Sequence, residues 1–306
     1  MPYLGNLTLR LSAGAMCLPE SVRRRHAEFL AAAQGDDGGF AGREGPSDLY
    51  YTGFGLRGLA ILGGLSETVA SRAAGFLAQH IEKSLPPVDF LSLVLSAVLL
   101  EMVTGGDVFG SVGRDLRQTL VERTEPSRRD DGGYAKSPRS GPSSTYHTFL
   151  VAACQQLVGV PVTEPDRIAR LARSRQRPDG GFVELAGLEH SGTSPTAAAL
   201  GLLRLLDAMD DRVRITSSGF LASMQNLEGG LRANTRIPVA DLLSTFVGLA
   251  ALDDLESLSE VDAAAARRYV ESLEVAQGGF RGGAWDDRPD VEYTFYGLGA
   301  LALLAA

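Results

Sequence analysis

A short glycine-containing phrase recurs along the whole chain at a nearly constant interval. The copies read QGDDGGF, RRDDGGY, RQRPDGGF, QNLEGGL and AQGGF, and they end at Phe40, Tyr134, Phe182, Leu231 and Phe280. The second glycines, Gly133, Gly181, Gly230 and Gly279, are 48, 49 and 49 residues apart, and Gly39 precedes Gly133 by 94, or two steps. One further copy, without glycines, is therefore expected near residues 84–89. Such a repeat predicts an array of similar structural units.

Each phrase lies between two segments that have helical character. In residues 261–275 the apolar and small side chains return at helical spacing, while Arg267, Arg268 and Glu271 occupy the other side. Residues 241–252 and 290–306 are apolar nearly all round, which indicates burial on every side. The sequence thus predicts six buried inner helices that alternate with six outer helices. The inner helices are expected to begin near Asp48, Asp89, Ser144, Ser194, Ala240 and Asp290, and the outer ones near Pro19, Ser66, Gly110, Glu164, Asp211 and Glu260.

Six helical hairpins can stack as an open solenoid or close into a ring. An open stack normally ends in capping repeats with polar outer faces, whereas the last inner segment is apolar up to Ala306. We therefore expect an all-α fold, an (α/α)6 toroid, in which the sixth hairpin packs against the first around a central cavity. Glycine tolerates the left-handed conformation, so the glycine pairs are expected where the outer helices end. The aromatic residue that follows each pair is expected to fill the gap between hairpins.

Composition agrees with one domain over residues 1–306. The repeat runs through the entire chain, and a hydrophobic content of 44% can form a large core. The net charge of -8 and the lack of a basic stripe argue against a nucleic-acid partner. Cys17 and Cys154 form neither a disulfide framework nor a paired metal-ligand spacing. These features favour a cytoplasmic protein.

The N-terminal residues 7–18 are moderately apolar, which raises the question of an export signal. No basic region leads this segment, and Met16 stands where a lipoprotein signal would have a small residue before Cys17. We therefore expect no signal sequence. No apolar run is long and charge-free enough to predict a membrane span.

The segments DLYYT (48–52) and DVEYT (290–294), each following a glycine phrase and a polar loop, carry a family resemblance. They resemble the β subunits of protein prenyltransferases and, more distantly, squalene and hopene cyclases, which use tryptophan where this chain has Phe40, Tyr134 and Phe182. The resemblance covers essentially the whole chain. It implies an α/α toroid whose cavity holds an isoprenoid against aromatic side chains, with the catalytic end at the starts of the inner helices. In that family a helical α subunit embraces the β subunit, and no second domain is found in this sequence to take that part, so a separate helical subunit stays open as a partner.

Aromatic residues concentrate in the first turns of the predicted inner helices. Such side chains can line an apolar cavity for a small molecule, or they can fill the core between hairpins; both readings stay open. Those expected to contact an isoprenoid are Tyr51, Tyr146, Phe246, Tyr296 and, in the loop before the last inner helix, Trp285.

The resemblance places a catalytic zinc at the starts of the fifth and sixth inner helices. The family binds this metal through an Asp-x-Cys pair and a His, and the matching positions here are Ala240, Leu242 and Tyr293. Zinc needs three or four converging donors, and none of the three family ligands is retained. We therefore expect no zinc at this place. Asp241, one residue from the aspartate position, and Tyr293 are kept as candidate catalytic residues.

Members of this family also bind an isoprenoid diphosphate near the starts of the fourth and fifth inner helices. His190 falls on the position of a family histidine, and Arg232 and Arg236 lie in the loop of the family arginine and lysine, although register places Asn234 and Ile237 at those two positions. The guanidinium group of arginine and the free N–H groups at a helix N-terminus both donate hydrogen bonds to phosphate oxygens. We expect His190, Arg232 and Arg236 to bind the diphosphate, which could bring magnesium with it. That the two arginines are simply surface charges is the alternative.

His147, in the segment STYHTF, has the repeat-equivalent position of Tyr51 and Tyr293. Cys154 lies two turns further along the same helical face, which is too far for both to bind one zinc. Among the four histidines, His147 is the candidate for a general base or a cation-stabilising group. The alternative is a histidine satisfied by a neighbouring hydroxyl or carbonyl.

Three functions stay open at this point. The first is an isoprenoid-binding protein that performs prenyl transfer or other terpenoid chemistry. The second is a class II terpene cyclase, although the Asp-x-Asp-Asp signature of those enzymes is missing. The third is a non-catalytic toroid that binds a lipid or a partner helix.

Aspartates near the inner-helix starts have a simpler interpretation than catalysis. Asp286, Asp287 and Asp290 in WDDRPD resemble the DDxxD motif of ionising terpene synthases, but Pro289 places most of this segment in a loop. Asp side chains accept backbone N–H groups at helix N-termini. We expect such caps at Asp48, Asp89, Asp241 and Asp290.

Overall fold

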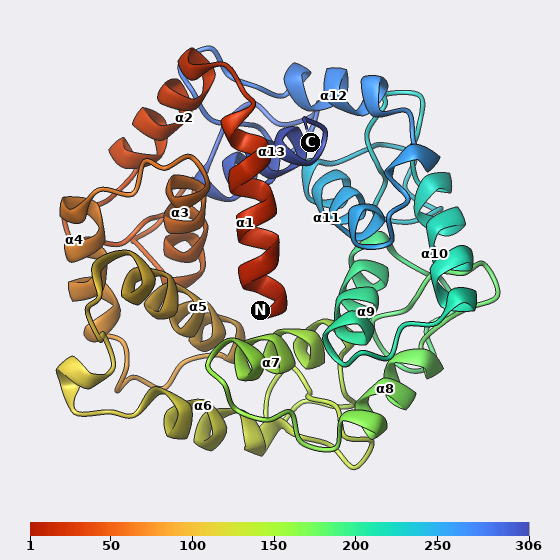
Figure 1. Cartoon of the computed structure of the whole chain (residues 1–306), viewed down its shortest axis with the longest axis horizontal. Coiled ribbons are helices and arrows are strands. Elements are labelled where there is room, and N and C mark those ends of the chain that lie inside the picture. The colour runs from red at the N-terminus through yellow and green to blue at the C-terminus, as the bar shows by residue number, and fades with distance from the viewer. Residues whose placement is uncertain (306) are drawn as a thin grey trace. The chain divides into compact units, whose positions relative to one another are not determined.

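The computed structural model describes residues 1–305, and their regular structure is helical (Figure 1). The six predicted inner helices are α3 (Leu49–Ile61), α5 (Pro87–Thr104), α7 (Thr145–Leu157), α9 (Thr193–Leu205), α11 (Leu242–Asp254) and α13 (Val291–Leu303). The six predicted outer helices are α2 (Glu20–Ala32), α4 (Glu67–Ala78), α6 (Leu116–Thr124), α8 (Pro165–Ser174), α10 (Asp211–Ser223) and α12 (Ala263–Ser272). The all-α prediction and its alternation of helices are therefore confirmed. Three short 3-10 helices, Gly110–Val112, Glu125–Ser127 and Leu258–Glu260, lie in the connections.

The chain forms two compact units, each assembled from separate stretches of sequence. Unit 1 comprises residues 1–6, 124–273 and 282–284. Within it, α9 packs between α7 and α11, while α8 and α10 pack on α9 and α11 respectively. Unit 2 comprises residues 7–123, 274–281 and 285–306. Within it, α3 packs between α5 and α13, and α2 and α4 cover this row.

The last inner helix packs against the first, as the apolar C-terminal segment predicts. In unit 2, α13 contacts both α3 and α2. The turn before α13 also docks on α2, where His26 contacts Glu274 and Gly279. The N-terminal and C-terminal portions of unit 2 thus share one core.

The glycine phrases build the same turn in each repeat. In the third glycine-bearing copy, Arg177 donates its N–H to the carbonyl of Gly181 at 2.8 Å, and Gly180 donates to Arg177 at 2.9 Å. Gly180 has a φ of +88°, which only glycine adopts readily. The sequence predicted that the glycine pair ends the outer helix. This is not the case for α8, which already ends at Ser174 with a right-handed cap residue, Arg175. The left-handed residue instead makes the turn that follows.

The residue after each glycine pair is buried, and that it fills the gap between hairpins stays a prediction. Phe182 is completely buried, and its N–H donates to Oγ1 of Thr196 in the first turn of α9 at 2.8 Å. Thr196 in turn donates to the carbonyl of Gly192 at 2.7 Å. The same bond joins Phe40 to Thr52, Tyr134 to Thr148, Leu231 to Thr245 and Phe280 to Thr294.

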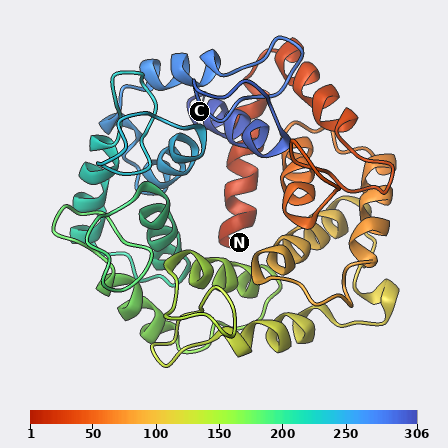
Figure 2. The same ribbon diagram turned by 180° about the vertical axis from the view of Figure 1, so that it is seen from behind.

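One further helix, α1 (Tyr3–Met16), precedes the predicted set. Its residues up to Asn6 belong to unit 1 and the rest to unit 2. In unit 2, Gly14 lies so close to the backbone of Ala302 that any side chain there would overlap it, and α1 lies beside α13 (Figure 2). In unit 1, the hydroxyl of Tyr3 donates to Asp254 at 2.5 Å.

The inner helix α5 has the length and apolar composition of a membrane-crossing helix, which the sequence inspection did not predict. It packs against α3 and α4, and buried core helices of soluble proteins meet the same criteria. Among the described residues it is the one helix with this property.

Candidate functional site

The first turns of four inner helices, α3, α7, α11 and α13, are set by the same kind of side-chain cap. The cap side chain accepts the N–H of the residue three positions later, which satisfies one of the helix's exposed donors. The pairs are Asp48 with Tyr51 at 2.7 Å, Ser144 with His147 at 3.0 Å, Asp241 with Ser244 at 2.7 Å and Asp290 with Tyr293 at 2.8 Å. Three of the four predicted aspartate caps are thus present, whereas Asp89 lies inside the first turn of α5 after the cap residue Pro86. Tyr51, His147 and Tyr293 take equivalent positions, as the repeat predicts.

A cavity of about 430 Å³ lies in unit 2 where α3 and α13 begin. Two predicted site residues, Tyr51 and Tyr293, line it together, although they are 242 positions apart in the chain. The remaining lining residues are all charged, namely Arg43, Glu44, Arg288, Asp290 and Glu292. The cavity therefore combines aromatic rings with both signs of charge.

An aromatic cluster in the same unit adjoins these tyrosines. Phe54 of α3 is at its centre, with ring centroids 4.9 Å from Tyr50, 5.1 Å from Tyr296 and 5.7 Å from Phe295. Tyr296, a predicted substrate-binding residue, is buried here and also meets Tyr293 at 6.1 Å. The predicted aromatic grouping at the starts of these two inner helices is thus a continuous set of ring contacts.

Glu292 carries its carboxyl group into this aromatic cluster. Its Oε1 accepts hydrogen bonds from the hydroxyls of Tyr50 at 2.7 Å and Tyr296 at 3.1 Å. Burial raises the pKa of Glu292, and Asp290 adds to this effect, while the bonds from the two tyrosines oppose it. Among the described residues Oε2 has no hydrogen-bond partner, and Glu292 lines the cavity. The carboxyl group is thus anchored through Oε1, and no described hydrogen bond holds Oε2.

The two arginines that line the cavity, Arg43 and Arg288, are already paired with carboxylates. Arg43 pairs with Asp286, contacts Asp290 at 3.0 Å, and lies over the ring of Tyr293. Arg288 contacts Glu44 at 3.1 Å. The WDDRPD segment therefore holds Arg43 in place through Asp286 and Asp290. This ion pairing gives the segment a structural role that does not need a metal.

His147 lies at the start of α7 in unit 1 and is 8% exposed. Its Nδ1 is 2.9 Å from Oγ of Ser144, and Ser144 also donates to Oε1 of Glu184. Nε2 of His147 is buried and has no hydrogen-bond partner. Burial, with a smaller effect of Lys136, lowers the pKa of His147, while burial raises that of Glu184. The three side chains form a hydrogen-bonded chain that ends in an unpaired ring nitrogen.

Asp241 is a helix cap in unit 1 with both oxygens engaged by one residue. Oδ1 accepts the N–H of Ser244, and Oδ2 accepts its hydroxyl at 2.7 Å. Burial raises the pKa of this carboxyl. The catalytic role of Asp241 stays a prediction beside its capping role.

Two residues predicted to contact the substrate through their rings also lie in unit 1. Phe246 is buried on α11, whereas Tyr146 on α7 is 39% exposed.

The three residues expected to bind a diphosphate lie in loops of unit 1. His190 and Arg236 are exposed. The guanidinium of Arg232 donates to the carbonyls of Ser223 at 2.9 Å and Met224 at 3.3 Å, at the end of α10. This is a favourable place for a cation, because the last carbonyls of a helix lack partners. The Arg232 side chain thus caps the C-terminal end of α10. That it binds an anion stays a prediction.

Trp285 is 62% exposed in the loop before α13, in unit 2. It does not line the cavity beside Tyr51 and Tyr293. Its contact with a substrate stays a prediction.

Sequence inspection missed the charged partners of the predicted site residues. Glu292, Arg43 and Glu184 were not singled out, although Glu292 lies within DVEYT and Glu184 follows a glycine phrase closely. A signal was available for Glu292, because a carboxyl group in the first turn of an otherwise apolar inner helix is a candidate buried acid.

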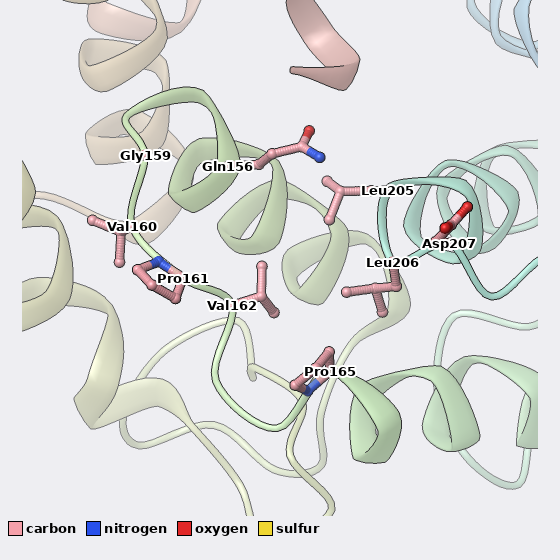
Figure 3. Close-up of a pocket in the computed structure, with 9 residues that line it drawn as sticks. All are labelled: Gln156, Gly159, Val160, Pro161, Val162, Pro165, Leu205, Leu206 and Asp207. Carbon is pink, nitrogen blue, oxygen red and sulfur yellow. The ribbon is translucent and has the colours of Figure 1, made fainter. Parts of the chain in front are cut away.

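A second cavity, of about 460 Å³, lies in unit 1 near the ends of α7 and α9. Figure 3 shows the apolar side chains of Val162, Leu205 and Leu206 around it, with Gln156 at one side. Gln156 accepts the N–H of Tyr3 at 2.7 Å. None of the predicted site residues lines this cavity.

The donor groups of the described chain do not form a metal site. In residues 1–305, no group of three or more His, Cys, Asp and Glu side chains is arranged to hold a metal ion. At the family zinc positions, Ala240 and Leu242 are buried apolar residues, and Tyr293 points its ring toward Arg43. Cys154 is fully buried, which raises its thiol pKa to about 12, and Cys17 is exposed.

Solved structures with the same fold have diverse activities. The chain matches the Candida albicans protein geranylgeranyltransferase-I complexed with GGPP with a TM-score of 0.71 and 14% identity, over 92% of this chain and 91% of that one. It matches a type II terpene cyclase from Scytonema, in complex with geranylgeranyl dihydroxybenzoate, with a TM-score of 0.64 and 14% identity, over 98% and 99%. It also matches a GH76A α-1,6-mannanase from Salegentibacter with a TM-score of 0.60 and 12% identity, over 93% and 98%.

The comparisons by sequence give a family but no characterised relative. No curated protein matches the chain significantly. Residues 17–94 and 96–306 match the family described as the prenyltransferase alpha-alpha toroid domain, which extends through both units and all six helical hairpins. The chain therefore belongs to the prenyltransferase alpha-alpha toroid domain family.

Proposed function

We propose that this protein binds an isoprenoid in the cavity of unit 2 and begins terpenoid chemistry on it by protonation from Glu292. The observation that carries the proposal is the position of this carboxyl group, which lines the cavity and has one oxygen held by Tyr50 and Tyr296. Aromatic faces stabilise both a polyene chain and a cation that forms on it. An acid surrounded by rings suits a reaction through carbocations.

The reaction is proton transfer followed by rearrangement. The proton on Oε2 of Glu292 moves to one carbon of an alkene, so that a C–H bond forms, the C=C π bond breaks and its other carbon becomes a cation. The electrons of the next alkene form the ring bond, and loss of a proton from the final cation leaves a cyclic isomer. Burial raises the pKa of Glu292 and so favours the protonated acid. The hydroxyls of Tyr50 and Tyr296 stabilise the carboxylate that remains.

The charges of the cavity favour an alkene over a diphosphate beside Glu292. Two arginines, Arg43 and Arg288, face three carboxyl groups, those of Glu44, Asp290 and Glu292, along the lining. Arg43 is in addition paired with Asp286. A bare diphosphate would meet more negative than positive charge here and would require magnesium.

Structural relatives support an isoprenoid as the ligand class. The geranylgeranyltransferase holds GGPP and the terpene cyclase holds geranylgeranyl dihydroxybenzoate. The mannanase shares the fold as well, so the proposal depends on the aromatic and acidic lining of this chain rather than on its fold.

The test is conversion of geranylgeraniol and geranylgeranyl diphosphate in D2O, with and without magnesium, followed by mass spectrometry. We expect a cyclic product from geranylgeraniol without magnesium that carries one solvent deuterium on carbon. A general acid contributes about 10²–10⁴-fold in rate, so Glu292→Gln should lose at least about a hundredfold. Glu44→Gln, which changes an exposed carboxyl at the edge of the same cavity, is the matched control and should retain activity.

Other outcomes would reject the proposal and identify the alternative. Reaction of the diphosphate alone, only with magnesium and without carbon-bound deuterium, would indicate ionisation of the diphosphate or prenyl transfer. Binding of either compound without turnover would indicate a non-catalytic lipid-binding toroid. Full activity of Glu292→Gln would exclude this residue as the acid.

A further inference from the structure

The two arginines that line the cavity of unit 2 differ in how firmly their guanidinium groups are held. Arg43 is paired with Asp286 and contacts Asp290 at 3.0 Å, and these two carboxylate side chains are only 8% and 5% exposed. The guanidinium of Arg43 also lies over the ring of Tyr293. A ligand anion that took over Arg43 would leave a buried carboxylate without its partner, which is costly. Arg43 is therefore fully used by the protein itself.

Arg288, in contrast, is held by one weak contact. Its Nη2 lies 3.1 Å from Oε1 of Glu44, and the two side chains are 56% and 83% exposed. Among the described residues, neither side chain has another hydrogen bond or ion pair. Exposed ion pairs stabilise a protein little and are screened by salt. Glu44 can therefore leave Arg288 at a small cost.

The backbone around Arg288 is fixed even though the end of its side chain is exposed. The residue before last, Asp286, is tied to Arg43, and Asp290, two positions further on, caps α13. Pro289 restricts the backbone between them. The loop thus presents the guanidinium of Arg288 at the edge of the cavity, and no folding of a new segment is needed for this group to meet a ligand.

The present partner of Arg288 indicates which ligand group can replace it. A ligand carboxylate in the place of Glu44 leaves Arg288 with one negative charge, as before, while Glu44 moves into water. A diphosphate carries more negative charge than one guanidinium balances, and Arg43 has no capacity to contribute. A carboxylate can also accept two parallel hydrogen bonds from a guanidinium, whereas Glu44 accepts one. The exchange therefore favours a ligand with a single carboxylate.

We propose that Arg288 binds the carboxylate of an isoprenoid acid in exchange for Glu44, so that the preferred substrate of this cavity carries a single negative charge. Arg288 is then a residue that determines specificity, and Glu44 does not touch the ligand. That the rest of the ligand is an isoprenoid chain rests on the proposed function, whereas the exchange at Arg288 does not.

The test compares how geranylgeranoic acid, geranylgeraniol and geranylgeranyl diphosphate bind to the intact protein without magnesium, by titration calorimetry at neutral pH. At low ionic strength we expect the acid to bind about three- to tenfold more tightly than the alcohol, the factor that one partly exposed ion pair supplies. Added salt should reduce this preference. Glu44→Gln should strengthen the binding of the acid, because the acid then meets Arg288 without an exchange, and should not change the binding of the uncharged alcohol.

Substitutions of Arg288 test the contact directly. Arg288→Gln should remove the preference for the acid, and Arg288→Lys, which keeps the charge, should retain part of it. The matched control is Arg24→Gln, because Arg24 of α2 is also exposed and lies 3.9 Å from an exposed glutamate, Glu28. This control should keep the full preference, and an equal loss in it would mean that net charge and not a contact is responsible, which overturns the proposal.

Three other results would also overturn it. They are equal binding of the acid and the alcohol to the unaltered protein, an undiminished preference in Arg288→Gln, and tighter binding of the diphosphate than of the acid. The proposed function is judged separately, because the titrations need no turnover and can be repeated in Glu292→Gln. Conversion of geranylgeraniol without any preference for the acid would reject the carboxylate site alone. A preference that depends on Arg288 but comes without turnover would reject only the acid role of Glu292, and absence of binding by all three compounds would reject both.

Discussion

At the scale of single residues, a threonine in the first turn of five inner helices joins two parts of each glycine-bearing repeat. Its hydroxyl donates to the carbonyl of the cap residue and accepts the N–H of the buried residue after the glycine pair, as Thr196 does for Gly192 and Phe182. The T of DLYYT and DVEYT is this residue, Thr52 and Thr294. The threonine of the DLYYT and DVEYT motifs, on which the family resemblance rests, therefore has a structural role in the fold.

Thr196→Val should destabilise the protein while keeping the shape of the side chain. The N–H of Phe182 would lose its only described acceptor inside the core, which costs about 1–3 kcal/mol. Urea unfolding followed by circular dichroism measures the change. Thr235→Val, in an exposed loop, is the control and should alter the free energy of unfolding by less than about 0.5 kcal/mol. Equal effects of the two substitutions would contradict this role of Thr196.

His26 predicts a loss of stability in mild acid. Its ring is completely buried, Nδ1 accepts the N–H of Gly279 at 3.0 Å, and Nε2 contacts Glu274 at 2.9 Å. Burial and the neighbouring Arg25 lower its pKa from 6.5 to about 4. The unfolded chain therefore binds a proton at a higher pH than the folded one, so stability is complete above pH 6.5 and falls as the pH approaches 4.

The size of this effect is up to about 3 kcal/mol, at 1.36 kcal/mol for each pKa unit. Urea midpoints between pH 7 and pH 4 should fall less steeply in His26→Gln than in the unaltered protein. His190→Gln, in an exposed loop, should keep the original slope. The same pH dependence in all three proteins would show that His26 is not the titrating group.

Sequence reasoning located the helix starts of the candidate site but not its chemical partners. Tyr51, His147 and Tyr293 were expected to be equivalent because a repeat fixes position along the chain. Glu184 and Ser144 meet through a hydrogen bond between residues 40 positions apart, and Arg43 meets Asp286 from 243 positions away. Side-chain contacts of this kind depend on how the loops fold back, which the repeat does not specify.

At the scale of elements, each glycine turn docks on the outer helix of the following hairpin. Gly180 lies so close to the carbonyl of Thr216 on α10 that a β carbon would overlap it, and a β carbon at Gly181 would approach the ring of Phe220 to 2.8 Å. The equivalent pair Gly278 and Gly279 docks on Arg25 and Phe29 of α2 within unit 2. The repeated glycines therefore bring neighbouring hairpins together, in addition to shaping the turn.

Two glycine-to-alanine substitutions should change stability in opposite directions. Gly180→Ala combines a φ of +88° with overlap on α10, so it should destabilise the protein by more than about 1 kcal/mol. Gly219→Ala, on the exposed side of the same helix with nothing within 4 Å, should stabilise it by about 0.5–1 kcal/mol. Thermal unfolding of both variants is the measurement. Stabilisation by Gly180→Ala would refute the docking role.

The repeat predicts the twelve helices of the hairpins, but α1 lies outside it. No glycine phrase precedes α1, and its contacts are made with distant residues, such as Tyr3 with Asp254 and Gly14 with Ala302. The apolar character of residues 7–18 raises the question of an export signal but does not by itself predict a helix packed on α13. A helix held by contacts more than 200 positions away leaves little local signal beyond its own periodicity.

At the scale of the whole molecule, each unit is made from stretches that are far apart in sequence. Unit 2 takes residues 274–281 and 285–306 from the C-terminal end, and these supply α13 and the turn that docks on α2. The apolar C-terminal segment predicts such a partnership, and the contacts of α13 with α3 confirm it. Stability of the N-terminal hairpins is therefore coupled to residues at the other end of the chain.

Residues 1–123 alone should not fold cooperatively. Without residues 274–306, α3 loses the helix that covers one side, His26 loses Glu274 and Gly279, and Gly14 loses Ala302. The exposed apolar faces should give a broad urea transition and fast amide exchange in α2 and α3. Co-expression with residues 124–306 should restore a complex with protected α2 and α3, since it returns all the missing contacts. A sharp transition for the isolated fragment would show that the N-terminal hairpins form a core without α13, and the coupling argued from these contacts would then be wrong.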